Sequence, residues 1–191
     1  MKFKTIKSIS MLAISLLIVI SSSCSNNASS NTEEKETKIK APKISIHDAT
    51  IAGNLEAVKQ HIAAGSDLNA KDPFGGSSAL IIAAVFGKPE IAKALIDAGA
   101  KLDMKNNEGS TAIHSAAFFC RTDILQMLLD AGADKDLKNN FGSTALESVS
   151  VPFNEVEAIY GMMEKQLGSM GLQIDLKRIE STRPQVANML R

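Results

Sequence analysis

Apolar residues recur at helical spacing in separate stretches of the chain. In the stretches 89–99 and 122–132 they fall on one face of a helix: Ile91, Leu95 and Ile96 in the first, Ile124, Leu128 and Leu129 in the second. Polar residues such as Lys93 and Gln126 stand on the other side, and a glycine ends each stretch. This pattern predicts two amphipathic helices that stop at Gly99 and Gly132, where a left-handed backbone suits glycine.

The pattern repeats along the chain from Ile44 onward. Glycine follows the second apolar stretch of each unit at spacings of 34, 33 and 39 residues: Gly65, Gly99, Gly132 and Gly171. A second glycine precedes the first stretch at spacings of 33 residues: Gly76, Gly109 and Gly142. Each unit therefore predicts a short helix, a turn, a second helix, a glycine stop and an extended loop.

The repeated unit resembles the ankyrin repeat. Its period matches the roughly 33 residues of that family, and the sequence TAIH at 111–114 stands where the family has its TPLH signature. The small residues Ala83-Ala84 and Ala116-Ala117 would let neighbouring helices stack closely. The resemblance covers Ile44 to about Leu190. It implies an all-α fold, an ankyrin-type α-solenoid of helix–turn–helix repeats with short β-hairpin loops.

Within the predicted domain 44–191 we expect about four repeats plus a C-terminal capping half-repeat. The fourth unit is longer than the others, with its extra residues around Val151-Pro152 or in the segment 161–171. Residues 176–191 would form the half-repeat. Lys135 replaces the usual apolar residue of the third loop, so we expect this loop to be looser.

The first residues of the chain predict a signal peptide over 1–23. Three lysines and no acidic residue precede an apolar run over 9–20, and small residues follow it. The run is short for a membrane-spanning helix, although an uncleaved anchor is an alternative. Cys24, directly after three serines, resembles the acylated cysteine of bacterial lipoproteins. The alternative for Cys24 is a free thiol near an ordinary cleavage site.

Residues 24–43 predict a lipidated cysteine followed by a flexible tether. This segment has no aromatic residue and almost no aliphatic one, so it cannot bury enough surface to fold. We therefore expect a folded domain held near a membrane by its lipid anchor, in the bacterial cell envelope, on the periplasmic side or at the outer membrane.

Charge and composition argue against several classes of function. The 21 basic and 21 acidic residues cancel, which removes the electrostatic argument for nucleic-acid binding. Two cysteines cannot form a disulfide framework, and the three histidines form no metal-ligand or catalytic spacing. We expect a monomer that is not an enzyme, with no cofactor, no metal and no small-molecule substrate, whose partner is another protein.

Two sets of residues are candidates for partner binding. By resemblance, the end of each inner helix faces the concave surface of the solenoid. These positions hold Ile51, Val85, Phe86, Phe118 and Phe119, which form an apolar stripe if they are exposed. These residues belong to the adjacent pairs Ile51-Ala52, Val85-Phe86 and Phe118-Phe119, and the alternative is that half of each pair is buried under the long fourth repeat. The second set lies at the loop tips: Phe74, Asn106, Asn107, Asn140 and Phe141.

The remaining unusual residues have structural interpretations. His47 and His114 occupy equivalent repeat positions, and in ankyrin repeats this histidine ties neighbouring loops together by hydrogen bonds. His61 falls on a second helix, where we expect a surface position. Cys120 replaces the usual glycine between two helices. It is either a small buried residue or a redox-sensitive thiol.

These observations predict a lipid-anchored envelope protein whose repeat domain binds an unidentified protein through its concave face and loop tips. One alternative is an immunity or inhibitor protein that masks an enzyme. Another is a structural or stress-protective envelope component without a single client.

Overall fold

The computed structural model describes residues 39–191, all within one compact unit, Thr37–Arg191. The predicted signal peptide, Cys24 and most of the tether lie outside the described residues. Within 39–191 the chain is helical and no strand is present. No helix in this part of the chain is long and apolar enough to cross a membrane. The predicted all-α solenoid is confirmed.

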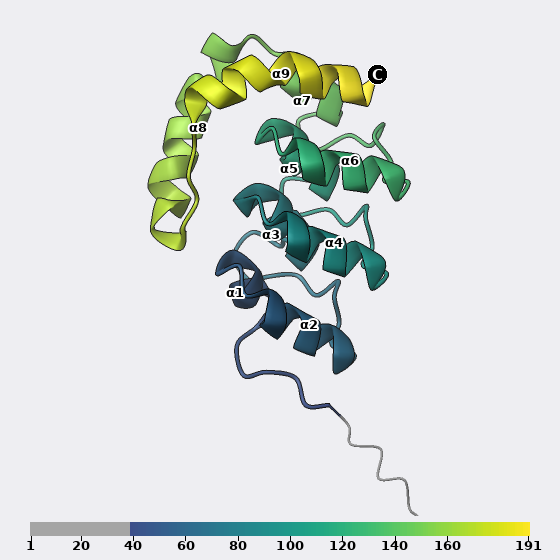
Figure 1. Cartoon of the computed structure of the whole chain (residues 1–191). Helices are drawn as coiled ribbons and strands as arrows, with labels where there is room; N and C mark the ends of the chain where they lie inside the picture. The colour runs from purple at the N-terminus through teal and green to yellow at the C-terminus, as the bar shows by residue number, and fades with distance from the viewer. Residues whose placement is uncertain (1–38) are drawn as a thin grey trace, which may run out of the picture. The chain divides into compact units, whose positions relative to one another are not determined.

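The helices follow one another in pairs and are stacked in two rows (Figure 1). The first three pairs follow the predicted repeat, and the fourth departs from it. In chain order the elements are α1 (Ile46–Ile51), α2 (Leu55–Ala63), α3 (Ala79–Phe86), α4 (Pro89–Asp97), α5 (Ala112–Phe118), α6 (Thr122–Asp130), α7 (Ala145–Ser150), α8 (Phe153–Leu167), the 3-10 turn η1 (Gly168–Met170) and α9 (Leu176–Leu190).

Small buried residues set the spacing of the inner row, α1, α3, α5 and α7. Ala83, Ala84, Ala116 and Ala117 are completely buried, so the backbones of successive helices approach closely. The outer row, α2, α4 and α6, turns its apolar face inward and buries large side chains such as Leu95. Each pair therefore completes its core only against its neighbours, as in other solenoids.

Polar residues start the inner helices. Ser78 and Thr144 cap α3 and α7 with side-chain oxygens that accept hydrogen bonds from the first-turn backbone. Gly87 ends α3 with a left-handed backbone, φ 61°. At Cys120, the equivalent position after α5, the backbone is also left-handed, φ 51°, although the residue is not glycine.

The loops between repeats are narrow turns. In each one a backbone hydrogen bond spans the turn: Asp72 N to Ser77 O at 2.9 Å, Asn106 N to Ser110 O at 3.0 Å, and Asn139 N to Ser143 O at 3.0 Å. A glycine N–H inside each turn donates a second bond back to Asp72 O, Asn106 O or Asn139 O. Residues 39–191 contain no strand pairing around these bonds. The hairpin-like loops of the fold are thus held by turn geometry and side chains.

The C-terminal part departs from the regular repeat. After α7 the chain forms the long helix α8 and then returns as α9, which packs along α7 and also touches α5 (Figure 1). Lys135 does not leave a loose loop. Its ammonium group donates hydrogen bonds to the carbonyl oxygens of Leu190 at 2.8 Å and Arg191 at 2.9 Å, and so holds the end of α9.

Candidate functional site

The loop tips carry the two most exposed large apolar side chains of the described residues. Phe74 is 91% exposed and Phe141 is 79% exposed. They project from the first and third loops, which are two repeats apart. A solvated ring contributes little to folding, so these two side chains are available for contact with another molecule.

The tips are tied to one another by asparagine residues. The backbone N–H of Asn107 donates to Gly75 O at 2.9 Å, and that of Asn140 donates to Glu108 O at 2.9 Å. The side-chain amide of Asn140 also donates to Asn107 O at 2.9 Å. Neighbouring glycines leave room for these asparagines, because a Cβ at Gly76 or Gly109 would collide with them. The tips therefore form one connected row with a fixed backbone.

A polar side chain at the start of each loop accepts hydrogen bonds from the backbone of that same loop. The carboxylate of Asp72 accepts hydrogen bonds from Phe74 N at 2.8 Å, Gly75 N at 2.9 Å and Ser77 N at 2.5 Å. Burial raises the pKa of Asp72, but these three bonds outweigh it and the pKa lies below its ordinary value. Asn106 plays the same part in the second loop, accepting from Ser110 N at 2.8 Å.

Asn106 is half-buried and is engaged within its own loop, whereas Asn107 and Asn140 are exposed. Sequence reasoning did not single out Asp72 or Asn139, which hold the first and third loops as Asn106 holds the second. A signal was available, since Asp72, Asn106 and Asn139 recur at the start of successive tips and such residues favour turns.

The ends of the inner helices do not form one exposed stripe. Ile51, Val85, Phe86 and Phe118 are half-buried. Phe119 is only 3% exposed and belongs to the core. In the third repeat the structure therefore has the buried arrangement rather than the exposed one, and Phe119 is not a surface residue.

The cause of this burial is Tyr160 on α8. Its ring stacks on Phe118 with the centroids 4.5 Å apart and meets Phe119 edge-on at 6.3 Å. Its hydroxyl donates to Phe118 O at 2.6 Å and accepts from Arg183 Nη1 at 3.2 Å. Burial, the largest effect, raises the pKa of Tyr160 to about 12. The long fourth repeat thus seals the end of α5.

The histidines act as structural links. His47 Nε2 lies 2.8 Å from Ala70 O, and His114 Nε2 lies 3.1 Å from Ser143 O, so each ring joins its helix to the following loop. Burial is the main cause that lowers the pKa of His114. The expected surface position of His61 is wrong. It is 7% exposed because its ring nitrogens contact Ser66 Oγ at 2.9 Å and Ile44 O at 2.8 Å.

Cys120 is a buried structural residue. It is 1% exposed, its thiol faces Ile179 O at 3.6 Å, and burial raises the pKa of the thiol. Such a thiol stays protonated and unreactive at neutral pH. Within residues 39–191 no group of three or more histidine, cysteine, aspartate or glutamate residues is placed to hold a metal ion.

Stacked helix pairs with narrow, linked loops define an ankyrin-type solenoid. The family model of ankyrin repeats matches residues 46–139 as three copies, and these residues are ankyrin repeats. The segment starts at α1 and runs into the third loop, so it contains the three regular pairs and leaves out α8 and α9. Ankyrin repeats are protein–protein interaction modules, and the match indicates no catalytic family.

Two curated relatives and one solved structure are similar over part of the chain. Protein phosphatase 1 regulatory subunit 27 from Homo sapiens is 41% identical over 64 residues, which are 34% of this chain and 41% of that protein. The Mus musculus protein gives the same values. The ankyrin repeat domain of Bcl-3 matches with a TM-score of 0.52 and 30% identity, over 54% of this chain and 45% of that one. The chain spans less than half the length of these proteins.

Proposed function

We propose that the repeat domain binds a partner protein through its loop tips, with Phe74 and Phe141 as the anchoring side chains. The observation that carries this proposal is their exposure, 91% and 79%, on a row of hydrogen-bonded tips. Aromatic side chains concentrate binding energy when a partner covers them. A fixed backbone lowers the entropy lost on binding.

Ile51, Val85 and Phe86, at the ends of the first two inner helices, are further candidate contacts. They are half-buried and lie in the repeats that precede α5, whose end Tyr160 covers. A partner that contacts both tips and these helix ends would lie along the first three repeats. Phe118 and Phe119 serve mainly to attach α8.

Photo-crosslinking tests the proposal while the partner is still unidentified. A benzophenone side chain replaces Phe74 or Phe141 in the full chain, and crosslinked proteins from the native cell are identified by mass spectrometry. Gln126, exposed on the outer helix α6, is the matched control site. We expect the same partner from both tip positions and none from Gln126. Equal capture at all three sites would contradict the proposal.

Alanine variants measure the contribution of the tips once the partner is captured. Phe74→Ala or Phe141→Ala should each weaken binding by more than about 1 kcal/mol. The free energy of unfolding should change by less than about 0.5 kcal/mol, because the rings are exposed. Calorimetric titration and thermal melting of the same variants check both values. Unchanged affinity in both variants would move the binding surface away from the tips.

A second function, regulation of an enzyme, is favoured by one comparison. The two curated relatives are named as regulatory subunits of a protein phosphatase. The chain would then act as an inhibitor or immunity protein that masks an enzyme. If the captured partner is an enzyme, its turnover with and without the wild-type chain distinguishes this function from simple attachment. A structural envelope role predicts no single captured partner.

The site of action that we propose is the bacterial cell envelope, with Cys24 acylated and residues 25–43 as a tether. What supports it is the order of basic, apolar and small residues that precedes Cys24. Cys24→Ala should move the protein from the membrane fraction to the supernatant or block its processing, as immunoblotting of fractions would show. Cys120→Ala is the matched control. A Cys24→Ala protein that remains acylated and membrane-bound would contradict the anchor.

A further inference from the structure

Basic side chains lie over the turns between the helices of successive pairs. The side chain of Lys88, directly before α4, lies against Gly53, and that of Arg121, directly before α6, lies against Gly87. Arg178, in the first turn of α9, donates to Cys120 O at 3.1 Å and Phe119 O at 3.3 Å. This edge of the solenoid is formed by the turns rather than by the loop tips.

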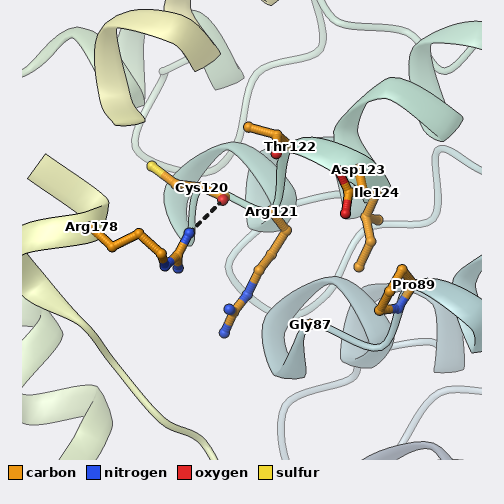
Figure 2. A pocket seen from close by; sticks show the side chains of 8 residues that line it. All are labelled: Gly87, Pro89, Cys120, Arg121, Thr122, Asp123, Ile124 and Arg178. Atoms are coloured by element: carbon orange, nitrogen blue, oxygen red, sulfur yellow. Dashed lines mark hydrogen bonds between the residues drawn. The ribbon is translucent and has the colours of Figure 1, made fainter. Parts of the chain in front are cut away.

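Two of these side chains border one groove. Figure 2 shows the guanidinium groups of Arg121 and Arg178 extending toward each other beside the turn at Cys120. The groove has a volume of about 300 Å³ and is also lined by Gly87, Pro89, Cys120, Thr122, Asp123 and Ile124. Burial, and after it the positive charge of Arg178, lowers the pKa of Arg121. The protein thus places two like charges side by side.

Neither guanidinium group has a carboxylate partner within residues 39–191. In both ion pairs of this part of the chain the basic partner is a lysine. Asp123 lines the groove but forms an ion pair with neither arginine. Arg121 Nη2 makes one long hydrogen bond, to Val85 O at 3.4 Å. Its Nε is buried and has no partner, and no other buried side-chain nitrogen or oxygen of the described residues is left in this way. A buried donor without an acceptor destabilises the folded state.

We propose that this groove binds a small oxyanion, a phosphate or carboxylate group, between Arg121 and Arg178. A negative charge there offsets the repulsion of the two guanidinium groups, and an oxygen acceptor satisfies Arg121 Nε. The planar donor fork of arginine matches both kinds of oxyanion. The amino end of α6, which begins without a side-chain cap, borders the same groove and adds N–H groups of favourable polarity. This binding site goes beyond the proposed protein-binding surface and shares no residue with it.

The test is a titration of the full chain, labelled with ¹⁵N, with inorganic phosphate and separately with succinate at constant ionic strength. Saturable shifts of the Arg121 Nε–H signal and of the amides of Thr122 and Asp123 are the expected result. Saturation by phosphate alone assigns a phosphate ligand, and saturation by succinate alone assigns a carboxylate ligand. No saturable shift with either anion in the wild-type chain overturns the proposal, whatever the variants do.

Variants separate this groove from general charge effects. Arg121→Gln should raise the Kd of the bound anion about tenfold, as expected for the loss of charge-assisted hydrogen bonds. Arg121→Lys keeps the charge but loses the fork, and should give a smaller rise. Lys88→Gln is the matched control, since it removes one positive charge at the same place one repeat earlier, and should leave the Kd unchanged. An equal loss in Lys88→Gln and Arg121→Gln would overturn the proposal.

Discussion

At the scale of single residues, a few side chains connect the C-terminal helices to the regular repeats. Tyr160 is the clearest case, because one ring contacts Phe118, Phe119 and Phe153, and one hydroxyl joins α8 to the end of α5. Lys135 is another, since it replaces an apolar residue in the repeat pattern and holds the last carbonyl groups of α9 instead. In both cases a residue that does not fit the repeat pattern attaches one of the C-terminal helices, α8 or α9, to the regular repeats.

The raised pKa of Tyr160 predicts a loss of stability in alkali. The unfolded pKa is near 10.0 and the folded pKa is about 12, so the unfolded state releases the proton first. The contribution of Tyr160 is therefore complete below pH 10 and is lost as the pH rises toward 12. It amounts to no more than about 3 kcal/mol.

Urea unfolding from pH 8 to 12 measures this loss, with Tyr160→Phe as the matched variant. The variant should be less stable at pH 8, because Phe118 O loses its donor and Arg183 loses one acceptor. The difference between the two proteins should shrink between pH 10 and 12. A constant difference over this range would show that Tyr160 is not ionised on unfolding and would contradict the assignment.

At the scale of the helix, two things restrict which residue can stand at a helix end: a left-handed backbone and the side chains packed against that position. Gly87 and Gly99 both have left-handed backbones at or after a helix end, with φ 61° and 80°. A Cβ at Gly87 would lie 2.9 Å from the guanidinium of Arg121, whereas a Cβ at Gly99 would meet nothing within 4 Å. The two positions separate backbone strain from steric contact.

Alanine at each of these positions tests that separation. Gly99→Ala should destabilise by about 1 kcal/mol, the ordinary penalty of a left-handed non-glycine residue. Gly87→Ala should cost more, because Arg121 must also move. In the double variant Gly87→Ala/Arg121→Ala part of this excess should disappear, as chemical denaturation would show. Equal costs at Gly87 and Gly99 would mean that Arg121 moves freely.

At the scale of the whole molecule, the two helices of each pair pack on one another and on the pairs beside them, and α9 packs on the last inner helices. Leu95, on the apolar face of α4, is completely buried. Leu95→Ala should lower the free energy of unfolding by about 2–5 kcal/mol. Far-ultraviolet circular dichroism should show mainly helix and one cooperative transition for both proteins.

Two controls make this result informative. Leu95→Met keeps most of the buried volume and should cost less than about 1.5 kcal/mol. Lys93→Ala, on the exposed side of the same helix, should change stability by less than about 0.5 kcal/mol. A spectrum dominated by strand would contradict the fold, and two separate transitions would show that the repeats unfold independently.

The sequence alone was enough to predict the helical repeats and their glycine stops, and the resemblance to ankyrin repeats implied the hydrogen-bonding role of His47 and His114. The helices and their glycine stops depend on local spacing, because apolar periodicity, N-caps and left-handed glycines act within a few residues. The position of Phe74 and Phe141 at the loop tips followed in the same way, and the structure shows that both rings are exposed.

Only the tertiary structure decided where the fourth repeat goes. The sequence shows extra residues after α7 but not where they pack. Phe119 and Tyr160 are buried because α8 packs on the end of α5, where Tyr160 contacts Phe118, a residue 42 positions earlier in the chain. The same holds for His61, which is buried by the segment that precedes α1. Arg121 and Arg178 likewise meet only because α9 returns to the end of α5. Such contacts depend on how whole elements pack, and no local pattern of residues specifies them.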